Sequence, residues 1–594
     1  MAQDDETLIS LFTRRKKAKQ ASLVEEKTSK TETSKTSLNW EWVKKHWVYF
    51  SILAGLVFIV YVNTLDNGLT SDDKGLLLDK NNLTTFKYIF SDPLSFIWSL
   101  THAPLYALFG INPTALRIPN ILMHLGNTFL VFLILTRLAN YRLGFITASL
   151  FAVHPVLTEG VTWISGGPYS WYSFFFLLSF LLYILRGKSR RIYYLSLVVF
   201  LIGLLTSNRV MQLFPILYVY EFVFGDLRKN FTKLIPYTVV SLVWGLFYFI
   251  QIGGRQESLQ SQFYLEKGLD NPLIQIPFAI VNYLTLIFYP NKYTFYHSDL
   301  TITQTQLALY WVGLLIFIGI WAFTFFKNRF LFFWLSFFVI SLLITLTPFR
   351  IAWIVAERYV YLGSIGIFVV VAYFLAKVIS RKSTAVLGWV LVAVIVGGLG
   401  VRAIIRNGDW QDEKTLWLAT VTSTPKSPKA HNNIGVIYMT EGKEFLQKRQ
   451  TKEAVEKLSL AEKELVQAIN LKQNYGDAYH NLGEVYTLAK QFDKAIPFFE
   501  QALKINPNLY LSHEFLASIY YEKGETDKTL DHLNQALKIK NNDPDIYINF
   551  AVVYRKLGKI DLAKQYLDAA LKLDPGNQQA QQMWVQLQSG STAP

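Results

Sequence analysis

Long apolar runs alternate with short polar segments along the first two thirds of this chain. Each run approaches the length at which an α-helix crosses the hydrocarbon core of a bilayer, about 20 residues. The runs occupy residues 47–65, 118–137, 143–165, 169–185, 193–207, 210–225, 234–253, 275–290, 308–326, 330–348, 359–376 and 384–401. The pattern therefore predicts an all-α fold that begins with a polytopic helical membrane domain over residues 47–405.

Lysines and arginines gather in the short segments between the apolar runs, and their distribution predicts the topology. The segments "RLANYR", "RGKSRRIY" and "GDLRKNFTK" fall on the same side as the N-terminus, which the positive-inside rule makes cytoplasmic. The later basic segments "FKNRF" and "KVISRKST" fall on the same cytoplasmic side only if one apolar run between residues 234 and 307 does not cross the membrane. The weakest is 275–290, which opens next to Pro277 and closes at Pro290, so we expect a re-entrant or interfacial helix there. The prediction is about eleven spans, a cytoplasmic N-terminus and an external location for everything after Val401.

Beyond residue 420 the apolar runs stop and a 34-residue period begins. Large residues, tyrosines and alanines recur at this step, at Leu482, Leu516 and Phe550, at Tyr486, Tyr520 and Tyr554, and at Ala468, Ala502, Ala536 and Ala570. This period with these residue types is the tetratricopeptide repeat pattern, in which each repeat is a pair of helices. We therefore expect an α-solenoid over residues 427–585, joined to the membrane domain by a connector at 406–426.

The first repeat departs from the period. Tyr438 precedes Tyr486 by 48 residues, so about fourteen extra residues are expected between the two helices of this repeat. The tyrosine and alanine columns are typical of core packing between helices. Stacked repeats present a concave groove that binds extended peptides, which predicts a protein or peptide partner.

The two ends of the chain lack apolar periodicity. Residues 1–46 are rich in Ser, Thr and Lys, a composition that cannot bury a core, and they predict a disordered basic cytoplasmic tail. Residues 586–594 predict a second disordered tail. No cleavable signal peptide precedes the first apolar run, which we expect to remain as a membrane anchor.

Composition narrows the class of protein. Of the 594 residues, 52% are hydrophobic and 15% aromatic, which is typical of a membrane protein. The formal net charge is +15, but the cations lie mainly between apolar runs, where they orient a membrane protein, so nucleic-acid binding is not expected. The absence of cysteine excludes disulfides, thiolate metal sites and cysteine nucleophiles, and it favours a prokaryotic plasma membrane.

Two adjacent carboxylates, Asp72 and Asp73, follow the first apolar run in the segment "TSDDKGLL". The predicted topology puts them on the external face, near the membrane surface. Neighbouring side chains of an extended segment point in opposite directions, so one aspartate can face a reaction centre while the other braces the loop. A solvated turn or a helix cap explains the pair equally well on residue chemistry alone.

Ionisable residues near membrane depth are costly and point to function. In "FAVHPVLTEGVTWISGG", Pro155 can open a helix, with His154 just before it and Glu159 one turn later. This imidazole and carboxylate either belong to a site near the external face or hold helices together as a buried pair.

Two arginines on the predicted external side are candidates for binding phosphate. Arg358 follows Glu357 in "AERYVYLGSIG", and a guanidinium can grip phosphate through paired hydrogen bonds. The alternative for Arg358 is an intramembrane ion pair with Glu357 or Glu159. Arg209, in "TSNRVMQLFP", is either a second phosphate clamp or an interfacial anchor.

Other recognisable chemistry is missing from the sequence. It contains no Gly-rich phosphate loop, no histidine cluster with metal-ligand spacing and no serine elbow. Acidic residues can hold a divalent metal ion, but no ligand set is legible, so no cofactor is assigned.

Five segments occur in an order that resembles a known family. They are "YVNTLDNGLTSDD", "NILMHLGNTFLVF", "LFAVHPVLTEGVTWISGG", "ERYVYLGSIG" and "RNGDWQDEKTLW", and tetratricopeptide repeats follow them. Together they resemble the transmembrane and tetratricopeptide repeat-containing O-mannosyltransferases and their bacterial relatives, which are membrane glycosyltransferases of the GT-C class. The resemblance covers nearly the whole chain after residue 47.

The resemblance implies an inverting transfer of a sugar from a polyprenyl-phosphate donor to a hydroxyl of a protein or peptide acceptor. It also implies an acidic residue of the first external loop at the active site, and of the two aspartates we favour Asp73 over Asp72. Such a carboxylate would orient or deprotonate the acceptor, an effect worth about 10²–10⁴ in rate. The repeats would lie on the same external side and recruit the acceptor.

The resemblance likewise assigns the polar residues near the donor. Arg358 and Arg209 would stabilise the leaving phosphate as its charge develops. His154, Glu159 and Glu357 belong to the same predicted donor site, which lies at the membrane surface because the donor arrives with its lipid.

Three departures from the family pattern support a second interpretation. Family members usually carry Arg-Pro-Leu where this chain has Asp92 before Pro-Leu, Ser-Gly-Arg where it has Gly167 after Ser-Gly, and Lys-Glu where it has Asn208 and Arg209. The alternative is therefore a catalytically degenerate, membrane-anchored tetratricopeptide repeat scaffold for protein–protein interaction. A transporter fits less well, because the polar residues cluster at one face and a transport path needs them near the midplane.

Overall fold

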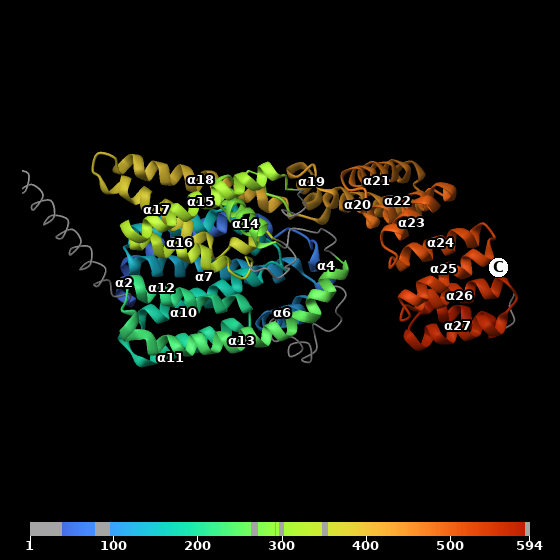
Figure 1. Ribbon diagram of the computed structural model, residues 1–594, viewed down its shortest axis with the longest axis horizontal. Helices are drawn as coiled ribbons and strands as arrows, with labels where there is room; N and C mark the ends of the chain where they lie inside the picture. The colour runs from blue at the N-terminus through green and yellow to red at the C-terminus, as the bar shows by residue number, and fades with distance from the viewer. Residues whose placement is uncertain are drawn as a thin grey trace, which may run out of the picture. The chain divides into compact units, whose positions relative to one another are not determined.

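The computed structural model describes residues 39–77, 96–262, 271–291, 293–295, 302–346 and 354–588. Every regular element in these residues is a helix (Figure 1), so the predicted all-α fold is confirmed. The chain divides into two compact units, residues 1–416 and 417–594. Asp92 and most of the two predicted tails lie outside the described residues.

Each of the twelve apolar runs of the first unit forms a helix, as predicted. These helices are α3 (Trp47–Tyr61), α7 (Pro113–Leu138), α8 (Tyr141–Val153), α10 (Pro168–Leu185), α11 (Arg190–Leu204), α12 (Leu213–Val223), α13 (Leu227–Gln262), α14 (Pro272–Phe288), α15 (Gln304–Lys327), α16 (Arg329–Leu342), α17 (Ser364–Ser380) and α18 (Ala385–Gly408). Short helices connect them, namely α4 (Asp72–Leu77), α6 (Phe96–Phe109), η2 (Pro155–Leu157), α9 (Glu159–Thr162), η4 (Asn208–Gln212) and η5 (Glu357–Val360).

Six helical segments of the described residues are long and apolar enough to cross a membrane. They are Trp47–Thr64, Pro113–Leu138, Pro168–Lys188, Leu227–Ile250, Gln304–Lys327 and Ala385–Gly408. A seventh candidate is a helix pair, Tyr141–Val153 and Pro155–Thr162, which bends by 59° at its break. Helix length and composition thus account for six or seven of the eleven predicted spans. The remaining apolar runs form shorter helices, and whether α14 crosses or re-enters stays a prediction.

A short helix, α2 (Trp40–Lys45), lies where the sequence pattern predicted part of a disordered tail. The Asn39 side chain caps it by accepting a hydrogen bond from the N–H of Trp42 at 2.9 Å. The Trp42 indole stacks on His46, with ring centroids 4.1 Å apart. Trp42 also packs on the core of the membrane unit, with its ring centroid 5.9 Å from that of Phe132, so a local cap and contacts with this core order these residues.

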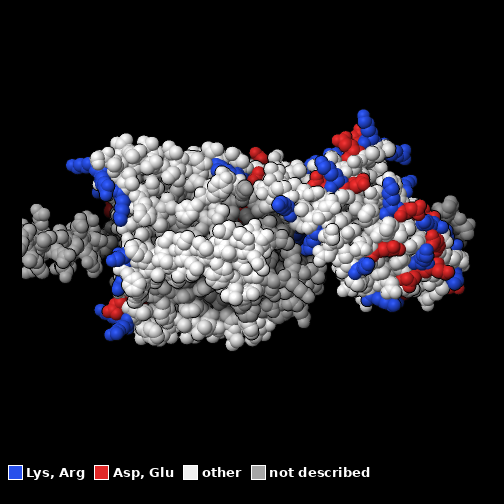
Figure 2. Space-filling view, turned by 45° about the horizontal axis from the view of Figure 1, so that its top comes forward, with Lys and Arg blue, Asp and Glu red and all other residues white. Residues whose placement is uncertain are grey.

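Lysines and arginines gather at one end of the membrane unit (Figure 2). The residues at this end come from the α10–α11 and α17–α18 connections, and they include the exposed Arg190, Arg381 and Lys382. The positive-inside rule makes a basic end cytoplasmic. The cytoplasmic assignment of this end stays a prediction.

The second unit is a series of antiparallel helix pairs. They are α20 (Pro428–Gln447) with α21 (Thr451–Leu471), α22 (Gly476–Leu488) with α23 (Phe492–Ile505), α24 (Tyr510–Glu522) with α25 (Thr526–Ile539), and α26 (Pro544–Lys556) with α27 (Ile560–Leu573), before a last helix, α28 (Gln578–Gln588). The periodic alanines are fully buried, so their predicted role in packing is confirmed. At Gly483, an added Cβ would lie 2.8 Å from the Phe499 ring, which explains a small residue next to Leu482.

The extra residues of the first repeat are helical. α20 and α21 have 20 and 21 residues, whereas α22 and α23 have 13 and 14. The expected insertion therefore lengthens both helices by about two turns each, and only residues 448–450 join them. The two helices remain tightly packed in the added part, where a Cβ on Gly442 would lie 2.9 Å from Leu458.

Candidate functional site

Asp73 is buried, and both of its carboxylate oxygens accept hydrogen bonds. Oδ1 accepts from the backbone N–H of Ser165 at 2.8 Å and from the Ser165 hydroxyl at 2.6 Å, and Oδ2 accepts from the N–H of Thr70 at 3.2 Å. The residue has 0% exposure. Burial raises the pKa of this carboxyl from 3.8 to about 6, although these hydrogen bonds oppose the shift. Asp73 therefore ties the first turn of α4 to the segment that follows α9.

Asp72 is the first residue of α4 and is exposed. Its nearest polar neighbour is the Ser71 hydroxyl, 3.5 Å from Oδ1, which is too far for a strong hydrogen bond. The loop around it is anchored by Glu413, which accepts from the N–H of Ser71 at 3.1 Å and pairs with Lys74 at 3.4 Å. The two adjacent aspartates thus have different surroundings, one sealed among hydrogen-bond donors and one open to solvent.

Arg117 of α7 fixes the chain just before the aspartates, although it was not among the predicted site residues. Its buried guanidinium donates to the carbonyl oxygens of Thr162 at 2.6 Å, Thr64 at 2.9 Å, Asn67 at 2.8 Å and Gly68 at 2.9 Å. One arginine therefore clamps the loop that precedes α4 to the end of α9. An arginine inside an apolar helical run is the sequence signal that points to it.

His154 is buried at the bend between α8 and η2. Its Nδ1 accepts from the N–H of Val156 at 3.2 Å, and its Nε2 lies 3.0 Å from the carbonyl oxygen of Ile287 in α14. A neutral imidazole protonated on Nε2 satisfies both contacts at once. His154 therefore caps η2 and holds α14, so both of its ring nitrogens are already occupied.

Glu159 and Arg358 form a buried ion pair. Glu159 Oε1 accepts from the Arg358 guanidinium, and Oε2 accepts from the Arg358 backbone N–H at 2.7 Å. The guanidinium carbon also lies 5.2 Å from the centroid of the Trp163 ring. The ion pair that the sequence offered as the alternative for Arg358 is therefore present, with Glu159 as its partner.

Glu357 pairs with a different arginine. Its Oε1 lies 2.7 Å from Nη2 of Arg406, in the last turn of α18, and the same guanidinium reaches Asp409 at 3.0 Å. Glu357 and Arg406 are each 1% exposed. Arg406 was not among the predicted residues, although it lies in the segment "RNGDWQDEKTLW" that contributes to the family resemblance. The carboxylate of Glu357 thus anchors η5 to α18.

Arg209 is a buried cation, and no ion pair joins it to a carboxylate within the described ranges. It is 9% exposed, and its Nη1 has no hydrogen-bond partner. Its Nη2 donates to the Tyr169 hydroxyl at 3.4 Å, and its guanidinium carbon lies 5.1 Å and 4.8 Å from the ring centroids of Tyr169 and Tyr359. Aromatic faces therefore provide most of the stabilisation of this charge.

The two predicted phosphate-binding arginines meet at one tyrosine. The guanidinium carbon of Arg358 lies 5.0 Å from the centroid of the Tyr359 ring, and that of Arg209 lies 4.8 Å from it. The group of Arg209, Arg358 and Glu159 carries one net positive charge. Nη1 of Arg209 is a buried donor that no group of the described residues engages, so an anion next to it would supply the missing partner.

One short segment, residues 163–169, links the aspartate loop to the arginines. The Trp163 indole donates to the Thr70 carbonyl oxygen at 3.2 Å and lies under Arg358, Ser165 holds Asp73, and Tyr169 accepts from Arg209. Such a chain of contacts fixes the relative positions of the loop and the cations.

Close packing explains the glycine of this segment where the family usually has arginine. An added Cβ at Gly167 would lie 2.1 Å from the side-chain oxygen of Asn120. The Asn120 side chain is itself held, because that oxygen accepts from the Trp171 indole at 3.0 Å. A larger residue at this position would therefore require Asn120 to move.

A metal centre is not evident in the part of the chain that the structure describes. No group of three or more His, Asp or Glu residues lies close enough there to hold an ion. The acidic residues of the site are instead engaged by arginines or by backbone and hydroxyl donors, apart from the exposed Asp72.

Comparisons with known families and structures identify the repeats. Models described as tetratricopeptide repeat match residues 476–509 and 544–577, and one described as TPR repeat matches 517–558. Among solved structures, a thermophilic tetratricopeptide repeat protein of Thermus thermophilus is 20% identical, covers 32% of this chain and 95% of its own, and has a TM-score of 0.25.

Comparisons with curated proteins cover both units. Protein O-mannosyl-transferase TMTC3 of Homo sapiens is 24% identical over an alignment of 535 positions that covers 77% of this chain and 56% of that protein. The Mus musculus protein of the same name is 25% identical over an alignment of 534 positions, with the same coverage of 77% of this chain and 56% of its own length. The chain thus spans little more than half the length of these relatives. The predicted resemblance is confirmed: the chain resembles the transmembrane and tetratricopeptide repeat-containing O-mannosyltransferases.

Proposed function

We propose that this protein is an integral-membrane glycosyltransferase of the GT-C type, which transfers a sugar from a polyprenyl-phosphate carrier to a hydroxyl of a protein acceptor. The observation that carries the proposal is the uncompensated Arg209 beside the Tyr359 ring, which the Arg358 guanidinium also approaches. A buried guanidinium without a carboxylate is costly unless a ligand neutralises it. A lipid-linked phosphodiester is an anion that reaches this depth.

The two arginines have different roles in this proposal. Arg209 binds the donor phosphate through Nη1, which no protein group engages but which is buried, so neighbouring side chains move aside to admit the phosphate. Arg358 is held in place by Glu159, so its guanidinium does not move toward the phosphate. It acts on the phosphate from a fixed position. His154 and Glu357 are positioning residues, because each fixes a neighbouring helix through contacts that leave no free atom facing a substrate.

Asp72 is the carboxylate that we assign to the acceptor, with Asp73 as its positioning residue. A general base needs hydrogen-bond reach to the proton that it accepts. Asp73 has 0% exposure, and Ser165 and Thr70 occupy its oxygens, whereas Asp72 is exposed at the start of the same helix. The resemblance points to one of the two aspartates without choosing between them, and Asp73 was our first choice from the sequence; the difference in accessibility is our reason for the opposite assignment.

The reaction balances with these groups. The acceptor oxygen attacks the anomeric carbon of the sugar as its proton passes to the Asp72 carboxylate. The bond between the anomeric carbon and the phosphate oxygen breaks, and the polyprenyl phosphate leaves with the bonding electron pair. Attack opposite the leaving group inverts the anomeric configuration. The tetratricopeptide repeats recruit the acceptor, and on the predicted topology both units act on the extracytoplasmic side.

The test measures sugar transfer by the purified full-length chain in lipid nanodiscs. Polyprenyl-phosphate mannose is the donor, and serine- and threonine-containing peptides are the acceptors. We expect Asp72→Asn to lower kcat by about 10²–10⁴. We expect Arg209→Gln to lower kcat/KM by about 10²–10³, and Arg209→Lys to recover part of the loss because it keeps the charge without the planar fork.

The matched control is Lys74→Gln, which removes a charge two residues from Asp72 and breaks only the exposed pair with Glu413. Its kinetics should stay close to those of the wild type. Unchanged turnover in Asp72→Asn contradicts the catalytic assignment. Unchanged donor KM and kcat in Arg209→Gln contradicts the phosphate site.

The alternative function is a membrane-anchored scaffold without catalysis. The observation that favours it is the replacement of family residues at the site, in particular Gly167, where a larger side chain would require Asn120 to move. A wild-type chain that transfers none of a panel of polyprenyl-phosphate sugars, yet still captures proteins through its repeats, would support this alternative.

A further inference from the structure

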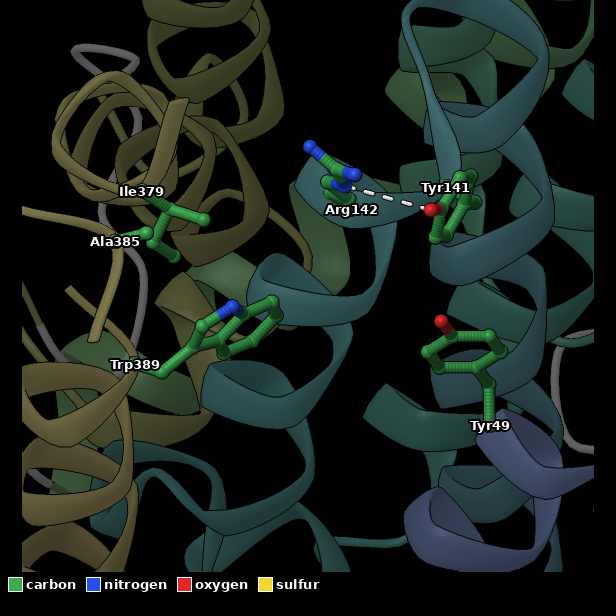
Figure 3. Close-up of a pocket in the computed structure, with 6 residues that line it drawn as sticks. All are labelled: Tyr49, Tyr141, Arg142, Ile379, Ala385 and Trp389. Carbon is green, nitrogen blue, oxygen red and sulfur yellow. Dashed lines mark hydrogen bonds between the residues drawn. The ribbon is translucent and has the colours of Figure 1, made fainter. Parts of the chain in front are cut away.

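A pocket lies at the basic end of the membrane unit, formed by the ends of four helices (Figure 3). Its volume is about 290 Å³. It is lined by Tyr49 of α3, Tyr141 and Arg142 of α8, Ile379 of α17, and Ala385 and Trp389 of α18. Figure 3 shows Tyr49 and Tyr141 on one side of the space and Ile379, Ala385 and Trp389 on the other. None of these residues belongs to the proposed active site.

The electrostatics of this pocket favour an anion. Arg142 is exposed, and within the described ranges no ion pair joins it to a carboxylate; its Nε donates to the Tyr141 hydroxyl at 3.3 Å. Tyr141 and Arg142 open α8, Ala385 opens α18, and Tyr49 lies in the first turn of α3. The pocket therefore gathers the N-terminal ends of α8, α18 and α3 around one guanidinium, and the C-terminal ends of α17 and of α2, which stops one residue before α3, oppose them.

The connection next to the pocket adds positive charge. Arg381 and Lys382, between α17 and α18, are both exposed. The turn that carries them is fixed, because the Thr384 hydroxyl donates to the Val378 carbonyl oxygen at 2.7 Å. The cations are thus held close to Ala385 at the edge of the pocket.

The apolar surface of α18 continues from the pocket along the helix. Trp389 is 38% exposed, and Val386, Val390 and Val394 are exposed by 77%, 51% and 65%. In a membrane, lipid acyl chains cover these exposed side chains. An indole at the boundary between basic and apolar surface is typical of the headgroup level of a bilayer.

A glycine brings α17 and α18 together in one wall of the pocket. At Gly388, an added Cβ would lie 2.5 Å from Cγ1 of Ile379 and 3.1 Å from its backbone nitrogen. α18 therefore packs directly on the end of α17 beside the pocket. This close approach fixes the wall of the pocket that α17 and α18 form.

We infer that this pocket binds the headgroup of an anionic phospholipid. The lipid phosphate interacts with Arg142 and the three helix N-termini, and Trp389 packs on the glycerol region. One acyl chain follows the exposed valines of α18. This inference does not rest on the proposed transferase function, since it concerns the opposite, basic end of the unit and predicts binding without chemistry.

The test counts lipids that remain on the delipidated full-length chain by native mass spectrometry, with phosphatidylglycerol and phosphatidylcholine added in turn. We expect one phosphatidylglycerol to bind at least tenfold more tightly than phosphatidylcholine. Arg142→Gln should weaken phosphatidylglycerol binding about tenfold, because it removes a charge-assisted contact. Arg142→Lys should retain most of the affinity, which separates loss of charge from loss of structure.

Arg190→Gln is the matched control, because Arg190 is exposed at the same basic end but does not line the pocket. It should leave phosphatidylglycerol binding unchanged. Four results overturn the inference: equal affinity for both lipids, undiminished binding by Arg142→Gln, an equal loss in Arg190→Gln, or displacement of the lipid by millimolar inorganic phosphate. The last result would assign the pocket to free phosphate.

Discussion

Replacing Asp73 with asparagine is expected to change how the stability of this protein depends on pH. Burial raises the pKa of the carboxyl, so the folded chain holds the proton more tightly than the unfolded chain does. The stability contributed by this group is therefore fully present below the ordinary pKa of 3.8 and is lost as the pH rises through about 6. Asparagine is neutral at every pH and has nearly the same shape, so it removes this dependence.

The size of the effect follows from the two pKa values. The difference between 3.8 and about 6 corresponds to roughly 3 kcal/mol, because one pH unit is worth about 1.4 kcal/mol. Most of the change falls between about pH 4 and pH 6. At neutral pH the variant also loses a hydrogen bond, because its NH₂ group faces the Thr70 N–H when its oxygen accepts from Ser165. The pH dependence, and not the absolute stability, is therefore the quantity to compare.

The assay is equilibrium unfolding of the full-length chain by SDS in mixed micelles, repeated at pH values from 4 to 8. The quantity of interest is the free energy of unfolding of the wild type minus that of Asp73→Asn, since other titrating groups cancel in this difference. It should fall by about 3 kcal/mol as the pH rises. Asp72→Asn, which alters the exposed neighbour, serves as the control and should leave the wild-type dependence intact. Parallel curves for wild type and Asp73→Asn would refute the reasoning.

Two further predictions concern the contacts around the site. Ser165→Ala removes the hydroxyl that donates to Asp73 and should cost about 1.5–3 kcal/mol in the same unfolding assay; additivity with Asp73→Asn would contradict a direct contact. Glu159→Gln leaves the buried charge of Arg358 without its partner and should cost about 3–5 kcal/mol. The double variant Glu159→Gln with Arg358→Met should recover part of that loss, and an unrecovered double variant would show that the pair is not the source of the effect.

The fold of the repeats could be predicted because their period is a local property of the sequence. A 34-residue step fixes which residues face the neighbouring helix, and the buried Ala502 and Ala536 lie where the period puts them. The location of the extra residues in the first repeat could not be predicted in the same way. A spacing between Tyr438 and Tyr486 counts residues but does not distinguish a longer loop from two longer helices.

The contacts of the site were less predictable, because they join segments far apart in the chain. Asp73 and Ser165 are 92 residues apart, and Glu159 and Arg358 are 199 apart. Because Glu159 and Arg358 carry opposite charges, the sequence predicted their ion pair as an alternative to phosphate binding. Residue type alone does not indicate which serine will donate a hydrogen bond to a given aspartate. The sequence therefore identified the two carboxylates near the membrane but did not predict which of them is buried.

The net charge of the groups around Tyr359 determines whether such a site would bind the donor tightly before reaction or stabilise the transition state. Arg209, Arg358 and Glu159 sum to one positive charge, and a polyprenyl-phosphate sugar is a phosphodiester with one negative charge. The bound donor is therefore neutralised, as a ground state should be. In the proposed reaction, the phosphate becomes a monoester whose charge grows toward two when the bond to the sugar breaks, and the unpaired Nη1 of Arg209 would meet that growing charge. A site with a second uncompensated arginine would bind the donor more tightly before reaction, which lowers KM without raising kcat. In the proposed reaction, the Glu159–Arg358 pair would therefore limit ground-state binding of the donor, and Arg209 would stabilise the transition state.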